Sequence, residues 1–211
     1  MAKRKPRNHR DLQRRMPKRE PYDRVLIVVE GEKTERQYFS DLQQHYAISS
    51  ANITVTPGDG SNPITIVRHA KKRYADERKS GNPYDRVYCV FDRDEHPQFT
   101  EASRQAQDNR FHTARSWPCF EYWLLLHFGY QRSPFSSSQN KTQSQQCCSQ
   151  LKKKLPIYAK GMHGVFNKLI PQLETAKRHA AKALKDAETS GEPMPSTEIH
   201  LLVEYLQHIK G

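Results

Sequence analysis

The stretch RVLIVVEGE, residues 24–32, decides the fold. Its first six residues, 24–29, are almost continuously β-branched or aliphatic, which is typical of a strand buried on both faces of a parallel sheet. The run ends at Glu30, so a carboxylate follows the strand directly. A second run of this kind, RVYCVF at residues 86–91, is followed by the tripeptide Asp-Arg-Asp at 92–94. We therefore expect two buried strands whose carboxyl ends carry acidic side chains.

Strand and helix signals alternate along the chain on either side of these two runs. The expected strands are 24–29, 52–57, 86–91 and 111–115, and the expected helices are about 33–45, 64–79, 99–109 and 118–128. Pro118 stands at the first position of the last helix, where proline is favoured. This alternation predicts an α/β domain with a mostly parallel four-stranded sheet between helices and right-handed crossovers.

Composition divides the chain into three parts. Residues 1–20 hold nine basic and two acidic side chains with almost no apolar ones, so we expect a disordered basic arm. Residues 21–129 form the predicted α/β domain. Residues 130–211 begin with a Ser/Gln-rich insertion and continue as a helical C-terminal extension, which we expect to pack on the same domain.

The chain is strongly basic. Its 211 residues include 35 Lys and Arg against 23 Asp and Glu, a net charge of +12. Such a surplus favours a nucleic-acid partner, although the arm at 1–20 would serve equally as a solubility tail. The apolar runs LIVV and WLLL are too short to cross a bilayer, and no apolar segment of a signal peptide follows the basic start, so we expect a cytoplasmic protein without membrane association. The four cysteines contain no CxxC pair, which favours reduced thiols and gives no spacing typical of zinc.

The acidic side chains at the two strand ends are the main candidates for chemistry. Ligands of an open parallel sheet bind outside the carboxyl ends of its strands. If residues 92–94 remain extended, Asp92 and Asp94 point to the same side, because side chains alternate along a strand. With Glu30 they would supply oxygen ligands suited to Mg²⁺, or a group that moves protons. Such spacing also arises by chance, and acids after a strand also stabilise helix N-termini, so the position at strand ends is what favours a site.

Four further charged side chains have two interpretations each. Glu121, in the first turn of the helix expected at 118–128, would add a carboxylate to the site or simply interact with the helix dipole. Lys33 and Arg36 would clamp a phosphate or form a solvated helix face. Arg93 would contact nucleic acid or neutralise the neighbouring aspartates.

Five segments together resemble the RloB family, Toprim-like proteins of bacterial antiphage defence and restriction loci. The resemblance covers roughly residues 22–210. The segments are VLIVVEGEKTERQYFSDL (25–42), the Gly-Asp-Gly-Ser-Asn-Pro loop (58–63), YDRVYCVFDRDEH (84–96), PCFEYWLLLHF (118–128) and PSTEIHLLVEYL (195–206).

This resemblance implies a Toprim-like fold and the carboxylate pattern that accompanies it. The family's glutamate after the first strand corresponds to Glu30, and its Asp-x-Asp motif corresponds to Asp92 and Asp94. In Toprim nucleases and topoisomerases the aspartate pair binds Mg²⁺, and the glutamate transfers a proton or is a further ligand. The resemblance also implies a partner ATPase of the RloA type.

The expected function is that of a Toprim-type nuclease or nuclease-like effector, a phosphodiesterase dependent on Mg²⁺ or Mn²⁺ that acts on RNA or DNA in antiphage defence. The alternative is a non-catalytic nucleic-acid-binding or sensor subunit that regulates the ATPase. Convergence of the carboxylates in one cleft would favour the enzyme, whereas a basic side chain filling that cleft would favour the binding subunit. The oligomeric state stays open, homo-oligomers included. The expected catalytic residues are Glu30, Asp92, Asp94 and Glu121, with Glu30, Asp92 and Asp94 as metal ligands and Lys33, Arg36 and Arg93 as nucleic-acid contacts.

Overall fold

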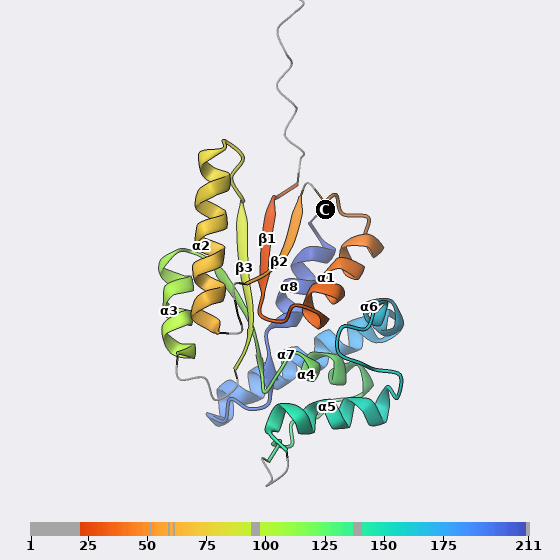
Figure 1. The fold of residues 1–211 in the computed structure, drawn as a ribbon. Coiled ribbons are helices and arrows are strands. Elements are labelled where there is room, and N and C mark those ends of the chain that lie inside the picture. The colour runs from red at the N-terminus through yellow and green to blue at the C-terminus, as the bar shows by residue number, and fades with distance from the viewer. Residues whose placement is uncertain are drawn as a thin grey trace, which may run out of the picture.

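The computed structural model describes residues 22–50, 52–58, 60, 62–93, 98–136 and 141–209. Its centre is a sheet of five strands in the order β2-β1-β3-β4-β5 (Figure 1). The first four strands are parallel, and only the short β5 runs antiparallel, against β4. The expected basic arm, residues 1–20, lies outside the described residues. The strands are β1 (Val25–Val29), β2 (Ile53–Pro57), β3 (Arg86–Asp92), β4 (His112–Trp117) and β5 (Ser196–Thr197).

Helices cover both faces of the sheet. The helices α2 and α3 lie on one face, and α1, α4 and the C-terminal helices lie on the other (Figure 1). Within the described part of the chain, every helix is too short or too polar to cross a membrane. The helices are α1 (Thr34–His45), α2 (Pro63–Lys79), α3 (Phe99–Asp108), α4 (Glu121–Leu125), α5 (Gln143–Lys154), α6 (Val165–Leu169), α7 (Leu173–Ser190) and α8 (Ile199–Gln207), with 3-10 turns η2 (Leu126–Phe128) and η3 (Ile170–Gln172).

Strand β1 contributes to two hydrophobic cores at once. Val25, Ile27 and Val29 face the core under α1 and the C-terminal helices, and Leu26 and Val28 face the core under α2. All five side chains are buried. Because neither face of the strand contacts water, its sequence is an uninterrupted apolar run.

Two sequence predictions are corrected by the fold. The expected four-stranded sheet has five strands, because the two residues of β5 are too few to produce a periodic pattern. A buried hydrogen bond of 2.8 Å between the hydroxyls of Ser116 and Thr197 helps to attach β5. The expected helix at 118–128 begins only at Glu121 and tightens into a 3-10 turn after Leu125, so Pro118 precedes the helix and does not occupy its first turn.

The strand order places a topological switch point between β1 and β3. From β1 the chain crosses through α1 to β2 on one side, and from β3 it crosses through α3 to β4 on the other side. The connections therefore diverge at the carboxyl ends of β1 and β3, and a crevice opens there. Glu30 and Asp92 stand at these two strand ends.

Candidate active site

A cleft of about 530 Å³ opens at the carboxyl ends of β1 and β3. It is bounded by the loop after β1, the first turn of α1, the loop after β2 and the first turn of α4. One side chain from the loop before α6 also reaches it. The lining residues are Glu30, Gly31, Glu32, Lys33, Thr34, Glu35, Gly58, Gly60, Asp92, Glu121 and Lys160.

Backbone pairing brings Glu30 and Asp92 together. The Glu30 N–H donates to the carbonyl of Val90 at 3.0 Å, which extends the pairing of β1 with β3 by one residue. The Glu30 Oε2 atom then accepts a hydrogen bond of 2.9 Å from the Asp92 N–H. Because side chains alternate along β3, Asp92 falls on the same face as Val90, which packs in the core under α1 and α4. Both predicted carboxylates therefore line the cleft.

The other two residues of the Asp-Arg-Asp motif lie elsewhere. Asp94 falls outside the described residues. Arg93 lines a second cleft, and its guanidinium lies 4.0 Å from the centre of the Trp117 ring and 4.7 Å from that of Phe99. Burial and the nearby Arg115 lower the pKa of Arg93. Of the two roles considered for Arg93, the neutralisation of Asp92 loses its basis, because Arg93 stacks on these rings outside the carboxylate cleft.

Glu35 is a cleft residue that the candidate set from the sequence does not include. Its side chain is only 7% exposed, although it is a carboxylate in the first turn of α1. A Cβ on Gly31 would lie 1.9 Å from a Glu35 carboxylate oxygen, so a larger residue at 31 would require the Glu35 carboxylate to move from this position. Burial, aided by the negative charge of Glu121, raises the pKa of Glu35 to about 7. A carboxyl group with this pKa exchanges protons readily at neutral pH.

Glu121 is held by a tyrosine and a lysine from the loop between α5 and α6. It is 3% exposed, and its Oε1 atom accepts a hydrogen bond of 2.9 Å from the Tyr158 hydroxyl. The Lys160 ammonium lies 3.7 Å from the same oxygen. The charge of Glu121 raises the pKa of Lys160. Glu121 is thus more than a partner of the helix dipole, because two side chains distant in sequence converge on it.

The loop that carries Lys160 is anchored on α1. The Gly161 N–H donates to Thr34 Oγ1 at 3.0 Å, and the Gly164 N–H donates to Asp41 Oδ2 at 2.9 Å. Gly161 has a φ of +77°, and a Cβ on it would lie 2.8 Å from the Cβ of Lys33. Glycine is therefore needed at 161 both for its backbone conformation and for the close approach of the two segments.

The two other basic candidates, Lys33 and Arg36, differ in whether they line the cleft. Lys33 is exposed and lines both the cleft and a neighbouring groove. Arg36 is also exposed but lines only the groove, one turn further along α1 and beside His163. Lys33 and Lys160 are thus the basic side chains of the described residues that border the carboxylates.

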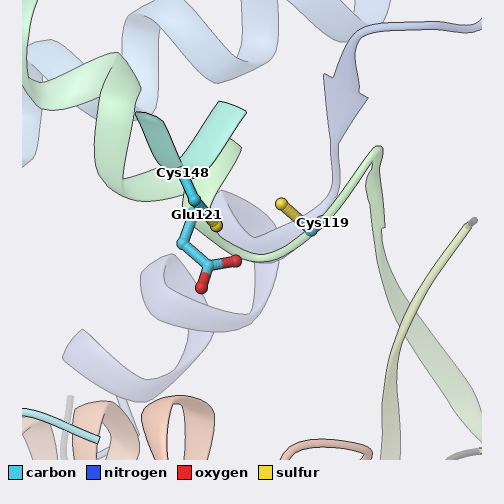
Figure 2. A group of neighbouring side chains, drawn as sticks. All are labelled: Cys119, Glu121 and Cys148. Atoms are coloured by element: carbon cyan, nitrogen blue, oxygen red, sulfur yellow. The ribbon is translucent and has the colours of Figure 1, made fainter. Parts of the chain in front are cut away.

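Two cysteines come close to Glu121. One oxygen of Glu121 and the Sγ atoms of Cys119 and Cys148 all lie within 4.8 Å of one another. Figure 2 shows the sulfur of Cys119 pointing toward Cys148 and Glu121. Glu121 is the first residue of α4 and Cys119 lies two residues before it, whereas Cys148 lies on α5, which packs against α4.

The carboxylates at the ends of β1 and β3 suit a hard divalent cation. Glu30 and Asp92 offer carboxylate oxygens at adjacent strand ends, and carboxylates with water are what Mg²⁺ prefers. The acidic residues Glu32 and Glu35 follow Glu30 within a few residues, and this acidic spacing was the signal that could have led to Glu35. Lys160 lies in an irregular loop, and no sequence pattern pointed to it.

Comparison of the chain with curated proteins and with solved structures found no match in either case. The family model described as RloB-like protein matches residues 25–206, from the first residue of β1 into α8. That match spans the sheet, the cleft and most of the C-terminal helices, so the chain belongs to the RloB-like protein family.

Proposed function

We propose that this protein is a Mg²⁺-dependent nuclease of the Toprim type, which cleaves phosphodiester bonds of RNA or DNA in antiphage defence. The observation that carries the proposal is the meeting of Glu30 and Asp92 in a cleft at the switch point of a parallel sheet. The buried Glu35 and Glu121 line the same cleft. With the exposed Glu32, five carboxylates line one crevice, an arrangement of little structural use because like charges repel one another.

The metal would be held by Asp92, with Asp94 and Glu30 as the further candidate ligands. A bound Mg²⁺ supplies neutralisation of the charge that develops on the phosphoryl group and lowers the pKa of a water ligand. Asp92 stands at the end of a buried strand, which is a rigid support for a ligand. Glu30 accepts a hydrogen bond from the Asp92 N–H and so also fixes the backbone of the ligand residue.

We propose Glu35 as a proton-transfer group of the site. Its pKa of about 7 places it where a general base and a general acid are both effective at neutral pH. Glu121 contributes through its charge, which helps to raise that pKa. The family motif points to Glu30 for this role, so Glu30 and Glu35 are the two carboxylates between which an experiment must decide.

Substrate phosphates would be bound at the basic rim of the cleft. Lys33 and Lys160 border the carboxylates, and Lys33 is the N-cap of α1, whose first N–H groups therefore lie at the same rim. A helix N-terminus attracts phosphate because of its unpaired N–H groups and its dipole. The net charge of +12 would strengthen binding of any nucleic acid.

Lys160 also favours the alternative function. Its ammonium lies beside Glu121 and already supplies a positive charge to the carboxylate cleft, as a metal would in a nuclease. In that case the protein would bind nucleic acid without cutting it and would regulate a partner ATPase of the RloA type. The exposure of the Lys160 side chain, 72%, favours the nuclease, because an exposed lysine can move aside.

The two functions are separated by an incubation experiment. The purified full chain is mixed with tRNA, mRNA, single-stranded DNA or duplex DNA, each with Mg²⁺, Mn²⁺ or EDTA. We expect cleavage of at least one substrate with metal and none with EDTA. The variant Asp92→Asn should lose cleavage, while Asp76→Asn, a change of the same chemistry at an exposed position on α2, should keep it.

Each outcome bears on the proposal. Cleavage that Asp92→Asn does not reduce would place the chemistry outside this cleft and overturn the proposal. Salt-dependent binding of nucleic acid without cleavage under any of the metal conditions would favour the regulatory subunit.

A further inference from the structure

The cluster of Cys119, Glu121 and Cys148 has donor chemistry that the Mg²⁺ site does not explain. Mg²⁺ binds oxygen ligands, and thiolates are ligands of softer metals such as Zn²⁺. The two cysteines are distant in sequence and do not have the spacing of a zinc motif, so no pattern along the chain indicates zinc. The packing of α4 against α5 brings them together.

We infer that Cys119, Glu121 and Cys148 form a binding site for a thiophilic divalent cation of the zinc class. The inference goes beyond the proposed nuclease function and stands independently of it. It rests on the mutual approach of two sulfur atoms and one carboxylate oxygen to within 4.8 Å.

The spacing of the three donor atoms is close to that of a tetrahedral zinc site. With Zn–S distances of about 2.3 Å and Zn–O distances of about 2.1 Å, tetrahedral ligand atoms lie about 3.5 to 3.8 Å apart. The distances between these atoms need to shorten by about 1.3 Å at most to reach that arrangement. Side-chain rotation of Cys148, which is only half-buried, is the least restricted way to do this.

Neighbouring residues already orient the carboxylate as a second coordination shell would. The Tyr158 hydroxyl donates to Glu121 Oε1 at 2.9 Å, and Lys160 lies 3.7 Å from the same atom. Hydrogen bonds of this kind fix a ligating carboxylate and raise metal affinity. Tyr158 is itself buried, so its hydroxyl is held in place.

Three protein ligands leave a fourth position for water. This is the arrangement of zinc sites that keep an open position, whereas sites with a purely structural role have four protein ligands. Glu121 and Lys160 line the cleft, and Cys148 lines a neighbouring pocket that Lys160 also borders. The cluster therefore lies next to solvent-accessible space on two sides, through which an ion can enter.

The test is metal binding by the full chain, with spectroscopy as the readout. Protein stripped with a chelator under reducing conditions is titrated with Co²⁺ and then with Zn²⁺. We expect a thiolate-to-cobalt charge-transfer band and the strong visible bands of tetrahedral cobalt to saturate at one thiolate-bound Co²⁺ per chain, and Zn²⁺ to abolish both. Tyr158→Phe should weaken Zn²⁺ affinity about tenfold.

Cysteine variants decide the location of the site. Cys148→Ser, at a half-buried position, should lose the charge-transfer band and bind Zn²⁺ at least tenfold more weakly. The matched control is Cys89→Ala, which removes a buried thiol of β3 in the core under α2, on the opposite face of the sheet. Absence of a thiolate band in the wild-type protein, or an equal band in Cys148→Ser, would overturn the inference. So would a Cys119–Cys148 disulfide in freshly purified, alkylated protein. None of these readouts depends on nuclease activity, so their failure would leave the proposed function standing.

Discussion

Replacement of Glu35 by glutamine gives the most direct test of how the cleft works. In the folded protein the pKa of Glu35 is raised from 4.5 to about 7, chiefly by burial. Folding therefore favours the protonated form, and ionisation of the buried carboxyl group costs stability. Glutamine resembles the protonated form in size and hydrogen bonding but cannot ionise. The variant Glu35→Gln removes this cost together with any proton transfer.

The magnitude and the sign follow from linkage between protonation and folding. Below about pH 4.5 the carboxyl group is protonated in both states, and its contribution to stability is fully present. Between that pH and about pH 7 the unfolded chain releases the proton first, so the wild-type protein loses stability as the pH rises. One pKa unit corresponds to about 1.4 kcal/mol, so the loss at high pH is at most about 3 kcal/mol.

The assay is chemical denaturation of both proteins across this pH range. The free energy of unfolding of Glu35→Gln, relative to wild type, should rise by up to about 3 kcal/mol between about pH 4 and about pH 8. Glu32→Gln is the matched control, because Glu32 has the same side chain in the same cleft but is exposed. A difference between Glu35→Gln and wild type that does not change with pH would refute the reasoning. If Glu35 transfers a proton, the more stable variant should also lose about 10²- to 10⁴-fold in cleavage rate.

Three further predictions concern the arm, the first strand end and the anchored loop. Deletion of residues 1–20 should flatten the slope of log K against log salt for nucleic-acid binding, and an unchanged slope would mean that the arm is only a tail. Glu30→Gln should slow cleavage. If excess Mg²⁺ restores the rate, Glu30 is a metal ligand, and if the rate stays low at every Mg²⁺ concentration, Glu30 is a proton-transfer group. A normal rate in this variant would remove Glu30 from the site. Gly161→Ala should lower thermal stability more than Gly191→Ala, because both have positive φ but only Gly161 also lacks room for a Cβ; equal losses would mean that the contact with Lys33 is unimportant.

The parts of the fold that sequence could predict are those whose pattern is local. The strand at 24–29 was predictable because burial on both faces leaves an apolar run with no polar interruption. The antiparallel β5 was not, because a strand of two residues is defined by its partner and has no period of its own. The late start of α4 at Glu121 was missed for a related reason, since Pro118 is compatible with a first helical turn as well as with the preceding bend.

The residues of the candidate site also differ in whether a local sequence pattern could predict them. Glu30 directly follows β1 and Asp92 is the last residue of β3, so the rule that parallel strands end at a common edge is enough to bring them together. Arg93 could have been placed on the other face by the alternation that groups Asp92 with Asp94. Lys160 and Tyr158 were beyond reach, because their approach to the cleft depends on a loop anchored through hydrogen bonds to α1.

The oxygen and sulfur ligands favour different metal ions, and a chelator removes both kinds of ion. Glu30 and Asp92 present oxygen to the cleft, and Cys119 and Cys148 present sulfur on the far side of Glu121. EDTA binds Zn²⁺ far more tightly than Mg²⁺, so loss of activity in EDTA would not show which ion had been removed. The informative comparison is stripped protein supplied with Mg²⁺ alone, with Zn²⁺ alone and with both. Full recovery in Mg²⁺ alone assigns the chemistry to the strand ends, whereas recovery only with both ions would mean that the sulfur cluster supports the active cleft through Glu121.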